Sequence, residues 1–250
     1  MKKIKLFCLP YAGGSSVIFS KWKYLIHENV TLVPIELAGR GTRIHEPLYP
    51  NIKEAVNDIF NRVKVEIGEG DYAFFGHSMG ALLSYELAQK ISNQGLKPPI
   101  HMFFSGRGAP HVKPLKEKKY HLLNESDFRS KILELGGTPP SFFDHPELLE
   151  LFLPVLRNDF KLASHNFTKR KVIPLPYDIT VFVGKDEDLS AEQIDGWKKH
   201  TEKHCQIHYF NGGHFFLNEE VENLVHRIYL ALYGDEKNQR HSPEFQNEVS

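Results

Sequence analysis

The stretch YAFFGHSMGALLSYELAQ, residues 72–89, joins a short aromatic run to a segment of helical periodicity through Gly76-His77-Ser78-Met79-Gly80. An apolar run, a tight glycine-flanked turn and a helix are typical of a parallel β–α unit. The spacing Gly-x-Ser-x-Gly in this setting is also the turn that exposes a nucleophilic serine. The stretch therefore has two interpretations, an ordinary strand-to-helix turn and a nucleophile whose surroundings are cleared of side chains.

Short apolar runs alternate with helix-like segments along most of the chain, as in repeated β–α units. The apolar runs predict strands over 4–9, 30–36, 72–77, 100–106, 179–184 and 205–210. Apolar residues at helical spacing predict helices over 17–27, 52–65, 79–93, 191–202 and 221–233. Continuous apolar strands are expected where helices cover both faces of a sheet. We therefore predict an α/β protein with a mostly parallel central sheet and helices on both faces.

Residues from about 109 to 170 break this alternation, because they are helix-like, proline-punctuated and aromatic without a strand signal. They lie between the fourth and fifth predicted strands. We expect a helical lid insertion over the carboxyl edge of the sheet, where loops carry ligand sites; the alternative is two further helices of the main layer. The prediction is one domain over 1–233 and a polar, disordered tail over 234–250.

The composition argues against several classes of protein. Because 31 Lys plus Arg balance 31 Asp plus Glu, the chain has no overall positive charge for nucleic acid or an anionic membrane surface. Cys8 and Cys205 lie in predicted strands and fit reduced, packed thiols better than a disulfide framework. No run approaches the roughly 20 apolar residues that span a bilayer, and the interrupted N-terminal run does not fit a signal peptide. We expect a cytoplasmic protein.

A nucleophilic Ser78 would need a base within hydrogen-bond reach, and the base an orienting acid. In this kind of turn the order along the chain is serine, acid, histidine. His214 is the candidate base, since it follows the last predicted strand and two glycines that allow a turn. The histidine ring could then reach Ser78.

The candidate acids follow the fifth predicted strand in KDED, residues 185–188. Each of the three carboxylates could accept the proton on the far nitrogen of His214. Asp188 is preferred, with Asp186 and Glu187 as alternatives. At least two of the three are then solvated loop charges.

Acyl transfer at Ser78 would also need backbone N–H donors for the developing oxyanion. Met79, directly after the serine, is one candidate. The other is Ala12, in the small-residue loop CLPYAGGSS, residues 8–16, after the first predicted strand. The alternative is a phosphate-binding loop, but the segment lacks the Gly-Lys-Ser/Thr ending of that motif.

Several motifs in order along the chain carry a resemblance to a known family. They are LPYAGG (9–14), GRGTR (39–43), GHSMGALLSYELA (76–88), LGGTP (135–139), FLPVLRNDF (152–160) and GGHFFL (212–217). Together they resemble the type II thioesterases of nonribosomal peptide and polyketide synthesis, an α/β-hydrolase group that includes the medium-chain thioesterases of fatty acid synthesis. The resemblance covers nearly the whole chain.

The resemblance implies an enzyme that hydrolyses acyl groups from the phosphopantetheine arm of carrier domains and so edits mis-primed synthetases. It implies Ser78 as nucleophile, His214 as base, and the Met79 and Ala12 N–H groups as oxyanion donors. In relatives the acid commonly stands three residues after the strand-ending glycine, which here is Glu187. We expect acyl or peptidyl carrier domains as partners, a monomer, and no cofactor, metal, nucleic acid or membrane.

Two groups of side chains are candidates for substrate or carrier contact. Arg40 and Arg43 could meet the phosphate of the arm or acidic carrier residues, or simply be solvated loop arginines. The aromatic residues of the insertion could line an acyl chamber or form the insertion's own small core; they are Phe142, Phe143, Phe152 and Phe160.

Three other functions share parts of this pattern. A medium-chain fatty acyl carrier thioesterase and a small-molecule carboxylesterase would use the same serine chemistry. An inactive hydrolase-fold binding protein would keep the fold without turnover. The complete set of serine, histidine and acid argues against the last, and the inserted block argues against a generic esterase.

Overall fold

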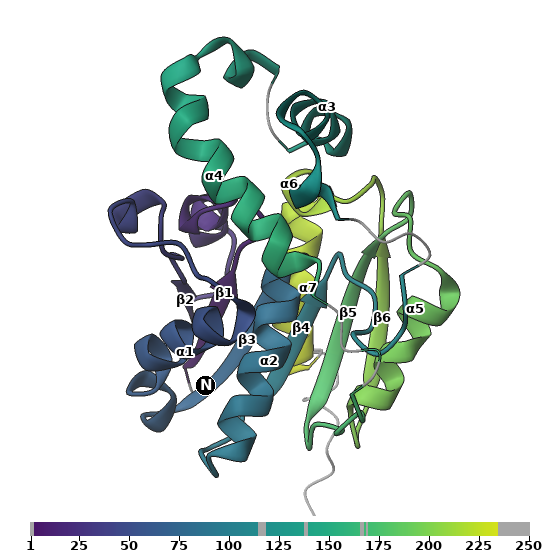
Figure 1. The fold of residues 1–250 in the computed structure, drawn as a ribbon. Coiled ribbons are helices and arrows are strands. Elements are labelled where there is room, and N and C mark those ends of the chain that lie inside the picture. Colours follow the sequence, from purple (N-terminus) through teal and green to yellow (C-terminus); the bar gives the residue numbers. More distant parts are fainter. Residues whose placement is uncertain (1–2, 115–118, 138–139, 166–167, 169, 235–250) are drawn as a thin grey trace, which may run out of the picture.

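In the computed structural model, the described residues are 3–114, 119–137, 140–165, 168 and 170–234. A six-stranded sheet in the order β2-β1-β3-β4-β5-β6 forms the centre of the molecule (Figure 1), and each neighbouring pair of strands is parallel. The strands are β1 (Ile4–Leu9), β2 (Val30–Pro34), β3 (Asp71–His77), β4 (His101–Ser105), β5 (Asp178–Gly184) and β6 (Cys205–Phe210). The six predicted strands are confirmed, with ends shifted by no more than two residues.

Helices cover both faces of this sheet (Figure 1). The α-helices are α1 (Ile52–Val63), α2 (Met79–Asn93), α3 (Glu125–Leu135), α4 (Pro146–Ala163), α5 (Ala191–Asp195), α6 (Phe216–Glu219) and α7 (Val221–Tyr233). Short 3-10 helices are η1 (Ser16–Tyr24), η2 (Gly41–Arg43), η3 (Glu66–Gly68), η4 (Tyr120–Leu122), η5 (Pro140–Asp144) and η6 (Gly196–His200). Two predicted helices differ in kind, because 17–27 is the 3-10 helix η1 and 191–202 divides into α5 and η6.

The pleat of the strands separates the core into two layers. In β1, Phe7 and Leu9 pack under α1 and α2, whereas Leu6 and Cys8 pack under η1 and α7. All four side chains are fully buried. The buried positions of a central strand with both faces covered are therefore apolar, which explains the apolar runs of the sequence.

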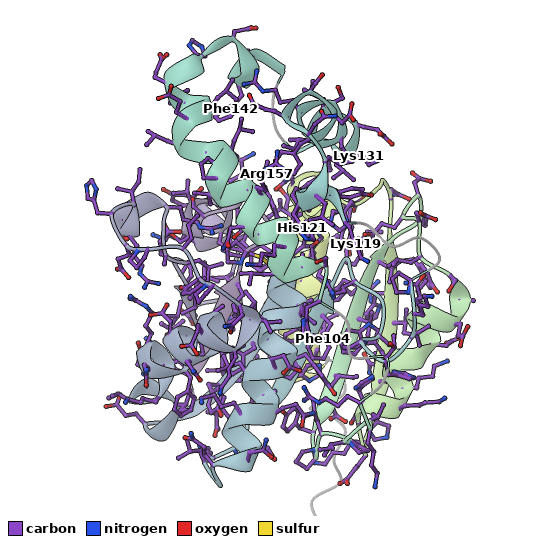
Figure 2. The ribbon with its side chains drawn as sticks, in the orientation of Figure 1. Phe104, Lys119, His121, Lys131, Phe142 and Arg157 are labelled. Carbon is purple, nitrogen blue, oxygen red and sulfur yellow. The ribbon has the colours of Figure 1, made fainter. Side chains whose placement is uncertain are left out.

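The segment between β4 and β5 contains α3 and α4, which rise above the carboxyl edge of the sheet in Figure 1. This placement matches the predicted insertion rather than two more helices of the main layer. Arg157, labelled on α4 in Figure 2, donates to the carbonyl oxygens of His121 and Leu123 at 2.8 and 2.7 Å. Its guanidinium also lies 4.2 Å from the ring centroid of Phe128. These contacts join the parts of the insertion to one another.

Cys8 and Cys205 are free thiols, as predicted. Within the described ranges, none of the helices is long and apolar enough to cross a membrane. The predicted disordered tail, apart from Gly234, lies outside the described residues.

Candidate active site

The turn from β3 to α2 holds Ser78 in a strained backbone conformation. Its φ and ψ are 55° and −109°, and it is the one non-glycine residue with positive φ in the described part of the chain. Such a conformation is costly for a residue with a Cβ and persists where the surrounding structure enforces it. Here the Ser78 N–H donates to the carbonyl of Ser105 at 2.8 Å, which ties the turn to β4.

Gly76 and Gly80 flank this turn because neither position has room for a side chain. A Cβ on Gly76 would lie 2.2 Å from the carbonyl oxygen of Gly80. A Cβ on Gly80 would lie 2.2 Å from the carbonyl oxygen of Leu9, at the end of β1. The contacts are with backbone, which cannot easily move away. The Gly-x-Ser-x-Gly spacing is therefore required by close packing of β3, α2 and β1.

His214 follows β6 in a short turn and lies beside the acid loop after β5. Its Nδ1 is 2.6 Å from Oε1 of Glu187, whose Oε2 accepts the Gly184 N–H at 2.9 Å. The Glu187 side chain is 3% exposed, whereas that of His214 is 33% exposed. The carboxylate is thus buried and fixed at both oxygens, and the outer part of the imidazole remains accessible. Ser78, His214 and Glu187 line one cavity.

The preference for Asp188 as the acid is wrong, because Glu187 is the carboxylate that meets His214. The N–H of Glu187 donates to the Gly184 carbonyl at 3.1 Å, a turn that folds its side chain back over the end of β5. Asp186 and Asp188 also line the cavity, but both are exposed residues of the same loop. The longer glutamate side chain spans the remaining gap from this turn to the imidazole.

His77, between Gly76 and Ser78, is a further histidine of the site. Its Nδ1 lies 2.8 Å from Oγ of Ser105, and its ring centroid is 5.0 Å from that of His214. Complete burial, and then the nearby His214 charge, hold the pKa of His77 well below its usual value. The ring is therefore neutral and packs beneath His214. Sequence patterns assign no role to this residue, since a histidine inside Gly-x-Ser-x-Gly has no distinguishing pattern.

The loop after β1 forms another wall of the cavity, through Tyr11, Ala12, Gly13, Gly14 and Ser15. Its turn is closed by the Gly14 N–H, which donates to the Tyr11 carbonyl at 2.9 Å. Ala12, the predicted donor, thus shares the cavity with Ser78. The Met79 side chain is fully buried, and its N–H belongs to the first turn of α2.

The cavity has a volume of about 610 Å³ and extends from Ser78 toward the insertion. Its wall there is apolar and aromatic: Ile132, Leu135, Phe152, Leu156 and Phe160. Phe152 and Phe160 thus line the cavity and also pack in the small core of α3 and α4. No cluster of three His, Cys, Asp or Glu side chains suited to a metal ion occurs among the described residues.

One predicted aromatic contact does not reach this wall. Phe142, at the distal end of the insertion in Figure 2, packs against Phe152 with ring centroids 5.0 Å apart and does not line the cavity. The side chain of Phe143 lies outside the described residues.

Arg40 and Arg43 are buried ion-pair residues, which corrects both interpretations of them as exposed. Arg40 is 5% exposed and forms a two-pronged contact with Asp159 of α4. Arg43 pairs with Glu46 and Asp58. The Arg40 guanidinium is committed to the buried Asp159, and the buried Arg43 guanidinium to the partly exposed Glu46 and Asp58, so neither side chain is available to a phosphate or a carrier surface. Asp159 was missed, since only the folded chain brings it to the loop after β1.

The comparisons with known proteins agree with this geometry. The family model described as "Thioesterase domain" matches residues 4–231. The chain is 36% identical over 235 residues to the protein named linear gramicidin dehydrogenase LgrE of Brevibacillus parabrevis, covering 92% of this chain and 88% of that one. It is 33% identical over 235 residues to the medium-chain S-acyl fatty acid synthase thioesterase of Rattus norvegicus, covering 91% and 86%.

A solved structure supports the same placement. The crystal structure of ClbQ from the colibactin NRPS/PKS pathway has a TM-score of 0.86 and 34% identity, covering 92% of this chain and 97% of that one. Despite the name of the first relative, the present sequence contains no Gly-x-Gly-x-x-Gly run of the dinucleotide-binding type. The chain therefore belongs to the thioesterase family and has the α/β-hydrolase fold.

Proposed function

We propose that this thioesterase removes acyl groups from the phosphopantetheine arm of carrier domains, and so clears mis-primed nonribosomal peptide or polyketide synthetases. The observation that carries the proposal is the union of Ser78, His214 and Glu187 in one cavity, in a chain whose relatives include a protein of an NRPS/PKS pathway. Residues of three separate strand ends contribute to this cavity, which is the arrangement that acyl transfer requires.

The mechanism follows from the chemistry of these groups. Ser78 Oγ attacks the thioester carbonyl as His214 takes its proton, and Glu187 holds the imidazole in the tautomer that leaves Nε2 free to accept. The Met79 and Ala12 N–H groups receive the oxyanion. The thiol, with a pKa of about 8.5, departs with the proton from His214. Water activated by His214 then attacks the acyl-serine and releases the acid, which restores the Ser78 hydroxyl.

The apolar wall formed by α3 and α4 would receive the acyl chain. Close to Ser78, the cavity is lined by the loop after β1 and by residues 106–110, which have mostly short side chains. The aromatic wall lies farther from the serine. A small acyl group would occupy only the space near the serine, and a longer one would extend toward Leu135 and Phe160. No group beyond the arm carried by the substrate is needed, and we propose that the enzyme acts as a cytoplasmic monomer.

Carrier domains loaded with acetyl, octanoyl or aminoacyl groups, measured by intact mass spectrometry before and after the enzyme, test this function. Rapid clearance of acetyl, with octanoyl cleared more slowly, supports editing. Untouched acyl carriers in the presence of an enzyme that cleaves nitrophenyl esters would instead favour a carboxylesterase.

Release of a medium-chain fatty acid is the second candidate function. It is favoured by the 33% identity to the rat medium-chain thioesterase and by the apolar length of the cavity wall. Octanoyl carriers cleared faster than acetyl carriers would decide for it.

A further inference from the structure

The contact between the insertion and the loop after β1 is made by a buried carboxylate. Asp159 of α4 is 0% exposed, and its Oδ2 accepts the Gly13 N–H at 2.7 Å. Arg40 holds the same carboxylate, with Nη1 donating to Oδ2 at 2.5 Å and Nη2 to Oδ1 at 2.8 Å. Nη1 of Arg40 also donates to the Gly14 carbonyl at 3.1 Å. Asp159 and Arg40 together thus hold the peptide group between Ala12 and Gly13 and the peptide group between Gly14 and Ser15.

Packing places α4 directly against the same point of the loop. Gly13 has φ of +80°, and a Cβ there would lie 2.2 Å from Cδ1 of Leu156, one turn before Asp159. Only a glycine allows α4 to approach this closely. The far end of the loop has a separate anchor, because Glu36 accepts the N–H and Oγ–H of Ser16 at 3.1 and 2.9 Å. The insertion therefore fixes the middle of the loop, beside Ala12.

We infer that Asp159 is a positioning residue that sets the Ala12 N–H, so that the oxyanion hole is complete only when α4 of the insertion is docked on the loop. An oxyanion donor must lie within about 2.7–3.1 Å of its oxygen, so a small shift at Gly13 is enough to weaken it. Helix α4 forms the acyl wall with Phe152, Leu156 and Phe160, and it also holds the donor loop with Asp159. It therefore couples binding of the acyl chain to activation of the thioester carbonyl. The inference rests on the proposed hydrolysis at Ser78.

The kinetic constant that changes, and the acyl lengths for which it changes, distinguish this role from a role in substrate fit. The carbonyl oxygen is common to all acyl groups, whereas the apolar wall touches only the longer ones. A lost oxyanion contact lowers kcat by the same factor for every acyl length and leaves KM nearly unchanged. A damaged wall would raise KM for long chains alone.

The test is the kinetics of Asp159→Asn on acetyl and octanoyl thioesters of N-acetylcysteamine. We expect kcat to fall by about 10- to 100-fold for both thioesters, with KM within about threefold of the wild type. An unchanged kcat, or a rise in KM for the octanoyl thioester alone, would overturn the inference. Wild type without activity on either thioester would count against the proposed function instead.

Two further variants keep the test decisive if the unpaired Arg40 impairs folding. Arg40→Met combined with Asp159→Leu removes both charges and should fold, yet should show the same loss of kcat. Arg43→Met is the matched control, a buried arginine with two acidic partners away from the cavity, and should keep kcat per folded molecule.

Hydrogen exchange gives a readout that does not depend on turnover. The peptide spanning residues 9–16 should exchange faster in Asp159→Asn than in the wild type, with the β3 peptide unchanged. Equal exchange of the loop in both proteins would contradict the positioning role even in an inactive enzyme.

Discussion

Oε1 of Glu187 lies 2.6 Å from Nδ1 of His214, at the meeting point of the loops that follow β5 and β6. The pair is fixed because the second oxygen of Glu187 accepts the backbone N–H of Gly184. A carboxylate so placed stabilises the Nδ1–H tautomer and the imidazolium that forms when His214 takes a proton from Ser78. In the proposed reaction, stabilisation of the positive charge on His214 thus depends on Glu187.

Glu187→Gln should lower kcat by about 10²- to 10⁴-fold, because the amide can turn its NH₂ toward Nδ1 and favour the wrong tautomer. KM should change little. Steady-state kinetics on a small thioester measures both. Asp186→Asn and Asp188→Asn are the matched controls in the same loop and should keep kcat within about threefold. A large loss in Asp188→Asn, with Glu187→Gln active, would return the role to the aspartate.

Gly80→Ala should destabilise the protein by about 1–3 kcal/mol or more, since the added methyl group overlaps the backbone at the end of β1. Denaturant unfolding followed by circular dichroism measures the change. Gly70→Ala is the control, because a Cβ at Gly70 has nothing within 4 Å and the residue has no positive φ. Equal midpoints for the two variants would refute the steric account of the motif.

Acid should destabilise the fold below about pH 6.5, where histidines in the unfolded chain take up protons. Burial lowers the pKa of His101 to about 4 and that of His200 to about 3, so both stay neutral in the native state. The unfolded chain then binds more protons between these values and pH 6.5. Stability is complete above pH 6.5 and falls by about 1.4 kcal/mol per pH unit for each such histidine.

Unfolding free energies measured from pH 7.5 to 5 check this slope. His101→Gln should make it shallower by about 1.4 kcal/mol per pH unit, because one proton-binding difference is removed. The exposed His145→Gln is the control and should leave the slope as in the wild type. A slope that neither variant changes would show that other groups cause the acid sensitivity.

Leu135→Trp should shorten the acyl chamber, because Leu135 lies on the cavity wall at the end of α3. We expect kcat/KM for the octanoyl thioester to fall by about 10-fold or more, with the acetyl thioester nearly unchanged. Leu133→Trp, on the exposed side of the same helix, should alter neither. If the acetyl and octanoyl thioesters lose activity equally, Leu135 does not border the chain.

Local patterns predicted the fold well because the central strands β1, β3, β4 and β5 are almost entirely buried and helical segments separate the strands along the chain. The Ser78 turn could also be recognised, because close backbone contacts among β3, α2 and β1 require its two glycines. The His214 position followed from chain order and its place after the last strand.

The remaining parts of the site depend on tertiary geometry. By residue type alone the three adjacent acids are equivalent, and the turn at Gly184 selects Glu187, the position that the family resemblance implied. Arg40 and Arg43 belong to a polar loop, so their burial could not be predicted without the insertion and Asp58 that cover them. Asp159 lies 119 residues from Arg40 along the chain, and no local pattern joins the two.

The most direct test of the central claim is acylation of Ser78 itself, followed by rapid-quench mass spectrometry with an octanoyl thioester. The account predicts an octanoyl group on the peptide that contains Ser78, formed within the first turnover and absent in Ser78→Ala. In His214→Ala its formation should be slower by several orders of magnitude. Full turnover by Ser78→Ala, or an acyl group on a different residue, would contradict the account.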